Sequence, residues 1–310
     1  MGDILLKKKV LITDYNYSSN DIERKLINDY GADLVETQAR TEDDVIKNAF
    51  DADAIITQYA PITEKVIKSL RKCKIIVTYG IGVDKIDVKA ASLNKIFVSN
   101  VPDYCLNEVA EHTIALLFCL ARKIIKMDIN IREGLWGYKN LAPIYRIKDR
   151  TVGIIGFGNI ARILVKKLRA FNFKNILIYD PYVKSEKFEK HNLKFVTLEE
   201  LIMKSDFISL HAPLNKETFH LIGEKQFKMM KPNSYIINVG RGSLIEEKCL
   251  YKSLKERWIG GAAVDVYENE PLTLDNPLLS LDNIILTPHA AWYSEEAIKD
   301  LKKKVAEESS

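Results

Sequence analysis

The feature that most constrains the fold of this chain is a regular alternation of short Ile/Val-rich runs with amphipathic helical segments. The runs include VLITDY (10–15), KIIVTYG (74–80), TVGIIG (151–156), KFVTL (194–198) and NIILTPH (283–289). Strands of a parallel sheet are joined by helical crossovers and covered on both faces, so they read as continuous apolar runs. The alternation restarts after a long helical pattern from about Asn107 to Arg132. This predicts an α/β chain of two tandem units, each a doubly wound parallel sheet.

Composition and charge exclude several classes of partner. The 46 basic and 42 acidic residues are interspersed and leave a net charge of +4, whereas a nucleic-acid-binding protein should gather a stronger basic excess on one face. The longest apolar stretch, IALLFCLA (114–121), is too short to span a bilayer, and the N-terminus lacks the apolar core of a signal peptide. The four cysteines form no CxxC or Cys/His metal pattern and predict reduced thiols. We expect a cytoplasmic protein with no metal, membrane or nucleic-acid partner.

A glycine-rich turn, GFGNIA (156–161), follows the first strand of the second unit and opens a helix. Gly156 permits the tight turn, and Gly158 lets the backbone approach a pyrophosphate. The free N–H groups and the positive end of the helix dipole, at Asn159 and Ile160, then face that anion. Such turns also occur for steric reasons alone, so the motif needs a second feature to predict a dinucleotide site.

Asp180 supplies that second feature. It ends the next strand, NILIYD (175–180), 24 residues after Gly156. An acidic side chain at this place can accept hydrogen bonds from the ribose hydroxyls of NAD and would repel the 2′-phosphate of NADP. The alternative is that Asp180 only caps the turn at Pro181. The pattern favours NAD as the cofactor.

Seven motifs, in order and at family spacing, resemble the D-isomer-specific 2-hydroxyacid dehydrogenase family. They are YGIGVDKID (79–87), NEVAEHT (107–113), GFGNIA (156–161), HAPLNKETFHLI (211–222), MKPNSYIINVGRGSLIEE (230–247), GAAVDVYENEP (261–271) and LTPHAAW (286–292). Within the family, VPDYC (101–105) and HAAWYSEEA (289–297) most resemble the branch that includes the C-terminal-binding proteins.

The resemblance implies a domain arrangement. Residues 1–100 and 290–310 would form a flavodoxin-like substrate-binding domain, and residues 101–289 a Rossmann NAD-binding domain, with the active site in the cleft between them. The segment 107–147 would pack against a second subunit, so a homodimer is implied. Relatives usually run further past the position of His289, so it stays open whether the chain is complete.

The resemblance also assigns a catalytic set to Arg241 in NVGRG, Glu270 in ENEP and His289 in TPH. Each alone has a structural alternative, as a turn charge, a loop carboxylate and a strand-end residue. Reduction of a 2-oxo acid needs hydride on carbon and a proton on the carbonyl oxygen. His289 would be the acid, stabilised as imidazolium by Glu270. Arg241 would present its planar fork to the substrate carboxylate and carbonyl oxygen.

Further site residues follow from the same resemblance. Substrate contacts are expected from Tyr79, from the backbone N–H groups of Ile81 and Gly82, and from Trp292, for which core packing is an equal alternative to a lid. The residues expected beside the cofactor are His211, Pro213, Val239 and Asp265. Asp265 would contact the nicotinamide amide, with a structural strand-end role as the alternative. His191 and His220 are interpreted as surface residues.

The predicted function is that of an NAD-dependent D-2-hydroxyacid dehydrogenase, which transfers hydride between NAD(H) and a small 2-hydroxy or 2-oxo acid. The alternative is an NAD(H)-sensing dimer that binds other proteins, as C-terminal-binding corepressors do. The complete Arg/Glu/His set favours the enzyme. The sequence does not name the substrate, the physiological direction of the reaction or a protein partner.

Overall fold

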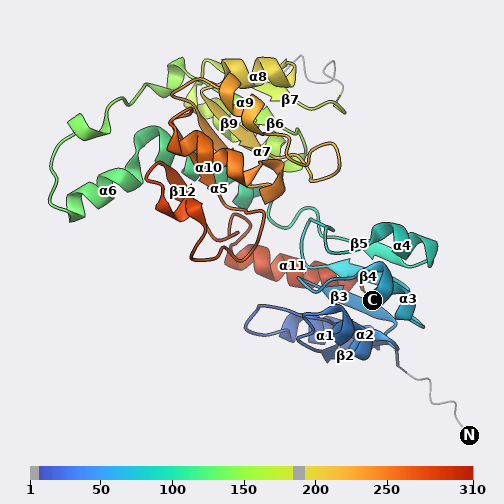
Figure 1. The fold of residues 1–310 in the computed structure, drawn as a ribbon. Coiled ribbons are helices and arrows are strands. Elements are labelled where there is room, and N and C mark those ends of the chain that lie inside the picture. Colours follow the sequence, from blue (N-terminus) through green and yellow to red (C-terminus); the bar gives the residue numbers. More distant parts are fainter. Residues whose placement is uncertain (1–6, 184–192, 310) are drawn as a thin grey trace, which may run out of the picture. The chain divides into compact units, whose positions relative to one another are not determined.

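The computed structural model describes residues 7–183 and 193–309, so His191 lies outside the described residues. The chain forms two compact units (Figure 1). Unit 1 comprises Met1–Tyr104 and Tyr293–Ser310, and unit 2 comprises Cys105–Trp292. These boundaries lie a few residues beyond the predicted ones, at 100/101 and 289/290.

Unit 1 contains a parallel sheet with the strand order β2-β1-β3-β4-β5. This is the flavodoxin-like order, in which the chain reverses direction across the sheet between β1 and β3. The strands are β1 (Lys9–Ile12), β2 (Asp33–Glu36), β3 (Ala54–Thr57), β4 (Ile75–Thr78) and β5 (Phe97–Ser99). The predicted flavodoxin-like architecture of this unit is confirmed.

Helices cover both faces of the unit 1 sheet. They are α1 (Asp21–Asp29), α2 (Glu42–Ala49), α3 (Glu64–Ser69), α4 (Val88–Leu93) and α11 (Glu295–Glu308). An aliphatic core, which includes Leu11, Ile55 and Ile76, lies between the strands and α2, α3 and α4. On the other side α1 packs against α11, so the C-terminal helix completes the unit that the N-terminus begins.

A buried ion pair joins these two helices. Glu23 of α1 is 0% exposed and Lys302 of α11 is 4% exposed, and their charged atoms lie 3.3 Å apart. The hydroxyl of Tyr79 donates to the same glutamate oxygen at 2.7 Å, and the Lys302 ammonium stands 4.5 Å from the centre of the Tyr17 ring. Two charges withdrawn from water in this way need each other, because either one alone would be strongly destabilising.

Unit 2 contains a parallel sheet with the strand order β12-β11-β10-β9-β6-β7-β8. In chain order the section from β8 to β11 reads 3-2-1-4-5-6, which is the Rossmann arrangement. The strands are β6 (Thr151–Ile155), β7 (Asn175–Tyr179), β8 (Lys194–Phe195), β9 (Phe207–Leu210), β10 (Tyr235–Asn238), β11 (Gly261–Val264) and β12 (Ile284–Leu286). The predicted Rossmann architecture is confirmed.

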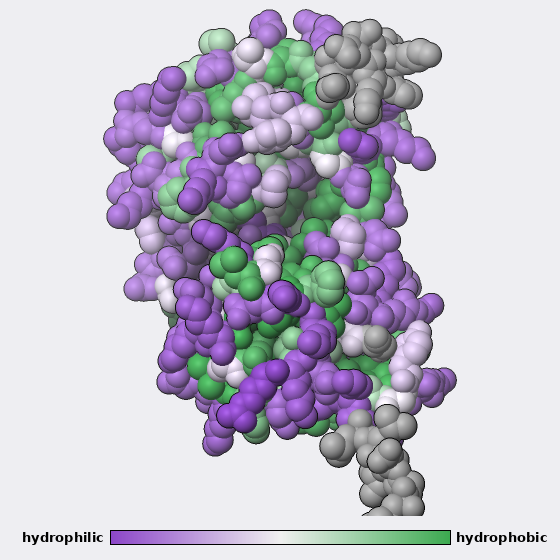
Figure 2. Space-filling model, turned by 90° about the vertical axis from the view of Figure 1, so that its right-hand side faces the viewer, coloured by the Kyte–Doolittle hydropathy of each residue, from purple (hydrophilic) through white to green (hydrophobic). Residues whose placement is uncertain are grey.

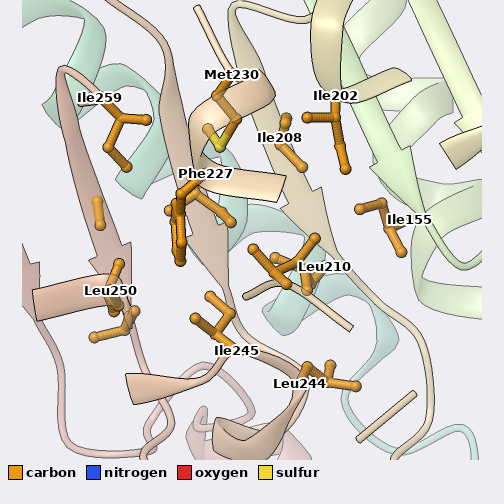
Figure 3. Close-up of a cluster of buried hydrophobic side chains, with 14 of the residues drawn as sticks. Ile155, Ile202, Ile208, Leu210, Phe227, Met230, Leu244, Ile245, Leu250 and Ile259 are labelled. Atoms are coloured by element: carbon orange, nitrogen blue, oxygen red, sulfur yellow. The ribbon is translucent and has the colours of Figure 1, made fainter. Parts of the chain in front are cut away.

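The helices of unit 2 again lie on both faces of its sheet. They are α5 (Leu106–Arg122), α7 (Asn159–Leu168), α8 (Leu198–Lys204), α9 (Glu224–Met229) and α10 (Glu247–Lys255). A further helix, α6 (Ile124–Arg132), follows α5 and has no buried residue. One face carries a core in which Phe227 packs among strand residues such as Ile208 and Leu210 and helix residues such as Leu250 (Figure 3). The opposite face is covered by α5, which packs against α7, β10 and β11.

Two element predictions need correction. The helix expected to run from Asn107 to Arg132 is broken at Lys123, which adopts a left-handed conformation with φ 53° and separates α5 from α6. The strand expected over 194–198 ends at Phe195, because the Thr197 side chain caps α8 by accepting from the Glu200 N–H at 3.2 Å.

Hydrophilic and hydrophobic side chains both reach the molecular surface. On the face drawn in Figure 2, hydrophilic residues predominate and hydrophobic ones show between them. Within residues 7–183 and 193–309, no helix combines the length and the apolar character needed to cross a membrane.

Candidate active site

The predicted site residues of unit 2 share one place in the fold, just beyond the carboxyl ends of parallel strands. Ligands of open α/β sheets bind at this edge. The residues and the strands they follow are Gly156 (β6), Asp180 (β7), His211 (β9), Val239 and Arg241 (β10), Asp265 and Glu270 (β11) and His289 (β12). The three predicted catalytic residues therefore come from strands β10, β11 and β12, which are consecutive neighbours in the sheet.

His289 and Glu270 meet directly. The ring nitrogen Nδ1 of His289 lies 2.7 Å from Oε2 of Glu270, and their side chains keep 40% and 35% of their surfaces exposed. In the described part of the chain, no hydrogen bond to the other ring nitrogen, Nε2, is found. Nε2 is thus available to bind a ligand, while Nδ1 is engaged in the hydrogen bond with Glu270.

The protonation state of Glu270 determines which of the two groups donates this hydrogen bond. Burial by itself would raise the pKa of Glu270, but the hydrogen bond and charge of His289, the Tyr267 N–H and the charge of Arg241 together lower it. Glu270 is therefore ionised and can only accept, so the proton of the shared bond sits on Nδ1 of His289. Nε2 can then either carry a proton or accept one, which is what acid–base exchange requires.

Arg241 stands on a loop whose position depends on Gly242. A Cβ at Gly242 would lie 1.9 Å from the Tyr267 carbonyl carbon and 2.5 Å from the Glu268 nitrogen. The loop that carries Arg241 therefore packs backbone against backbone on the loop that carries Glu270. The Asn238 side chain supports the same turn by donating to the Arg241 carbonyl at 2.9 Å.

Asp265 shapes the turn that carries His289. Its carboxylate is 0% exposed and accepts from the Thr287 hydroxyl at 2.6 Å and from the Ala290 and Ala291 N–H groups at 2.9 and 2.8 Å. His289 itself is in the left-handed region, with φ 54°, a strained conformation for a residue with a side chain. These contacts support the structural alternative for Asp265, because its oxygens are engaged in folding the histidine turn.

Two more side chains brace this turn. The Trp292 indole N–H donates to the His289 carbonyl at 2.8 Å, so the half-buried ring is anchored to the histidine backbone. His112 of α5 places Nε2 at 3.2 Å from the Thr287 hydroxyl. Within unit 2, Trp292 thus contacts the turn that carries His289, and its contact with a substrate stays a prediction.

The glycine-rich turn has the shape a dinucleotide needs. Gly156 has φ 86°, and a Cβ there would lie 2.6 Å from the Ala212 nitrogen, so only glycine fits. A Cβ at Gly158 would meet nothing within 4 Å, so the backbone there faces open space. Directly after it α7 begins at Asn159 with N–H groups that helix geometry leaves unpaired. These features fit a pyrophosphate.

Asp180 is tied to the same turn. One carboxylate oxygen accepts from the Phe157 N–H at 2.8 Å and the other from the Tyr182 N–H at 2.9 Å. Each carboxylate oxygen can accept a second hydrogen bond, so Asp180 can still accept hydrogen bonds from ribose hydroxyls. The geometry combines the two readings of the sequence, because the side chain both supports the turn and faces the nucleotide loop.

His211, Pro213 and Val239 follow strands β9 and β10 next to the glycine turn. The His211 N–H donates to the Ile155 carbonyl at 2.7 Å, and its Nε2 lies 2.8 Å from the Ser209 hydroxyl. Burial lowers the pKa of His211 from 6.5 to about 4, so the ring is neutral near pH 7. Val239 is buried and Pro213 is exposed.

The predicted substrate contacts of unit 1 lie after strand β4. The Tyr79 side chain is buried, and its hydroxyl is engaged with Glu23, so what this residue offers a ligand is limited to its backbone. The chain then turns at Gly80, with φ 144°. The Asn100 amide donates to the Ile81 carbonyl at 2.7 Å. Because a trans peptide directs C=O and N–H oppositely, this bond turns the Gly82 N–H away from Asn100.

Sequence reasoning missed three residues, one in unit 1 and two in unit 2. Gly242, Asn100 and His220 each hold a loop that carries a predicted site residue. His220 keeps 31% of its side-chain surface exposed, and in addition its Nε2 lies 2.7 Å from Glu268 Oε1. The motif GRG signals a constrained glycine, whereas nothing in the sequence pairs His220 with Glu268. Among the described residues, no cluster of histidine, cysteine and acidic side chains is arranged to hold a metal ion.

Comparison with known proteins identifies the family of this chain. The model of the D-isomer specific 2-hydroxyacid dehydrogenase NAD binding domain matches residues 114–291. A glyoxylate reductase of Korarchaeum cryptofilum is 39% identical over 268 residues, which cover 85% of this chain and 80% of the reductase. The chain belongs to the D-isomer specific 2-hydroxyacid dehydrogenase family.

Other relatives show the range of the family. A D-3-phosphoglycerate dehydrogenase of Methanocaldococcus jannaschii is 40% identical over 302 residues, covering 97% of this chain, and the chain spans 56% of that protein. The solved structure of an acyclic imino acid reductase in complex with NADPH and D-Arg matches with a TM-score of 0.87 at 34% identity, covering 96% of this chain and 94% of the reductase. The chain is thus an NAD-dependent oxidoreductase of D-2-hydroxy acids. Its nearest branch stays a prediction.

Proposed function

We propose that this protein is a reductase of small 2-oxo acids, with His289 as the acid–base residue, Glu270 as its partner and Arg241 as the substrate ligand. The observation that carries the proposal is the 2.7 Å bond between His289 Nδ1 and Glu270, which leaves Nε2 accessible. Relatives named glyoxylate reductase support a small 2-oxo acid as the substrate. Ile81 and Gly82 of unit 1 remain predicted ligands of its carboxylate.

The residues divide the chemistry between them. NADH supplies the hydride when bound. Arg241 holds the substrate carboxylate with its planar fork and polarises the carbonyl. His289 delivers the proton on Nε2 to the carbonyl oxygen, and Glu270 stabilises the charged ring beforehand and keeps Nδ1 protonated afterwards. In the oxidative direction, the neutral ring accepts the hydroxyl proton at the same Nε2.

The cofactor is held by the edge formed by β6, β7 and β9. Gly158, Asn159 and Ile160 would bind the pyrophosphate through backbone N–H groups, and Asp180 would accept the ribose hydroxyls. His211, Pro213 and Val239 would form the wall beside the nucleotide. The Asp265 carboxylate is engaged with the His289 turn, so we assign it the role of holding that turn.

The test is a panel of 2-oxo acids (glyoxylate, pyruvate, hydroxypyruvate and branched-chain acids) with NADH and with NADPH, each with and without added ammonium. We expect oxidation of NADH without ammonium and much weaker use of NADPH, because Asp180 repels a 2′-phosphate. A requirement for ammonium would indicate imino acid reduction. No oxidation of either cofactor across the panel would favour the alternative of an NAD-sensing binding module.

The role of His289 has its own test. His289→Asn should abolish turnover, since an amide cannot exchange a proton in this way, while NADH binding measured by fluorescence titration stays close to wild type. Retained turnover in this variant would refute the assignment of the acid.

We also propose a homodimer through the segment 107–147. In support, α6 has no buried residue, and this helix and the loop after it project from the rest of unit 2 (Figure 1). The exposed apolar side chains there include Ile129, Ile131, Leu135 and, at 94% exposure, Trp136. Trp136→Glu should give a monomer in sedimentation analysis, whereas Leu274→Glu, at an equally exposed position, should not. We also propose a cytoplasmic location, since the four cysteines are present as thiols and not as disulfides.

A further inference from the structure

A second histidine–glutamate pair lies beside the first. His220 Nε2 is 2.7 Å from Glu268 Oε1, and the two side chains keep 31% and 26% of their surfaces exposed. The same glutamate oxygen accepts from the Glu247 N–H at 3.1 Å. Because a carboxylate oxygen accepts, His220 donates through Nε2. Glu268 is two residues from Glu270 in the chain.

The backbone of His220 is fixed to a different loop. Its N–H donates to the Ser243 carbonyl at 2.8 Å, and Ser243 is two residues after Arg241. His220 has φ 52°, in the left-handed region. One residue thus bonds with its backbone to the Arg241 loop and with its side chain to the Glu270 loop.

Glu247 also holds the segment around Glu268 by hydrogen bonds. The Glu268 N–H donates to Glu247 Oε2 at 3.3 Å, which returns the bond that the Glu247 N–H makes to Glu268. Asn276 holds the second oxygen of Glu247 at 2.8 Å. Glu270 in turn folds back on this segment by accepting from the Tyr267 N–H at 2.9 Å. The position of the Glu270 carboxylate therefore depends on the Tyr267–Glu268 backbone.

We infer that His220 is a positioning residue that joins the Arg241 loop to the Glu270 loop and, through Glu268, holds Glu270 against His289. This role rests on the proposed reductase function. Without the bond from His220 to Glu268, the 267–270 segment loses one of the hydrogen bonds that hold it in place. Glu270 then stabilises the protonated ring of His289 less well. The charged and titratable groups concerned are His289, Arg241 and Tyr267 around Glu270, and His220 and Glu247 around Glu268.

Two variants separate the side-chain bond from the backbone conformation. His220→Asn keeps a residue that tolerates the left-handed region but is too short to reach Glu268, whereas His220→Gln carries an amide donor of matching length. We expect His220→Asn to lower kcat about tenfold, which is less than the roughly 100-fold loss that a misplacement of about 1 Å can cause. The KM for NADH should stay within about twofold, and His220→Gln should restore most of the activity.

The pH profile of 2-oxo acid reduction distinguishes positioning from general damage. In His220→Asn, reduction should fade at a lower pH than in wild type, in the same direction as in Glu270→Gln. The double variant should show no further movement, because both substitutions act through Glu270. An equal loss of activity at every pH, or additive effects, would overturn the positioning role while leaving the reductase function intact. Absence of turnover in the wild-type protein would overturn both.

Discussion

The pH dependence of stability in unit 2 should be dominated by one histidine. Burial lowers the pKa of His211 from 6.5 to about 4. Between these values the ring is protonated in the unfolded chain and neutral in the folded one. The unfolded state then binds more protons, so the free energy of unfolding falls as the pH falls from 6.5 to about 4, and it is unaffected by this residue above that range.

The size of the effect follows from the same two values. Each pH unit between them corresponds to about 1.4 kcal/mol, which places the full loss at about 3.5 kcal/mol. This is an upper figure, because His211 keeps part of its surface exposed to water. A typical domain is stable by about 5 to 15 kcal/mol, so the loss is a large fraction of the total.

The assay uses the natural fluorophores of the chain. All three tryptophans, at positions 136, 258 and 292, lie in unit 2, as does His211. Urea unfolding followed by tryptophan fluorescence at about pH 7.5 and pH 4.5 should show a smaller pH-dependent loss in His211→Gln than in wild type, by roughly 2 to 3 kcal/mol. Ser209→Ala should keep the wild-type pH dependence, because burial is the cause of the lowered pKa. An identical loss in wild type and His211→Gln would refute the reasoning.

Three further predictions concern other parts of the chain. Glu270→Gln should make 2-oxo acid reduction fade at a lower pH than in wild type, and an unchanged pH–rate profile would contradict the pairing. Gly242→Ala should lower kcat by about 100-fold, because its Cβ meets the backbone of the facing loop, whereas Gly223→Ala should be tolerated since the nearest atom is 3.3 Å away on a side chain. Lys302→Met should lower the free energy of unfolding of unit 1 by about 3 to 5 kcal/mol, measured by denaturation followed by circular dichroism. Adding Glu23→Gln should recover most of the lost stability, because no unpaired charge then stays buried. An equal shift of the unfolding transition of unit 2, followed by tryptophan fluorescence, would argue against a local effect.

The architecture and the local geometry of the glycine-rich turn could be predicted from the sequence. Ile/Val-rich runs between amphipathic segments predict buried parallel strands, because strands covered on both faces have no polar side to show. The turn GFGNIA and Asp180 were readable because their chemistry is local. Gly156 needs a left-handed backbone, and Asp180 ends the next strand at the same edge of the sheet.

Most contacts between distant segments could not be predicted from the sequence; the pair of Glu270 and His289, which the family resemblance implies, is the exception. The family motifs named Arg241, Glu270 and His289, but the bond between the last two exists because β11 and β12 are neighbours in the sheet. The engagement of Asp265 with the His289 turn, the burial of Tyr79 against Glu23 and the pairing of His220 with Glu268 have no sequence signal. Hydrogen-bond partners that are tens to hundreds of residues apart are chosen by packing, and a single sequence carries no record of which side chains packing brings together.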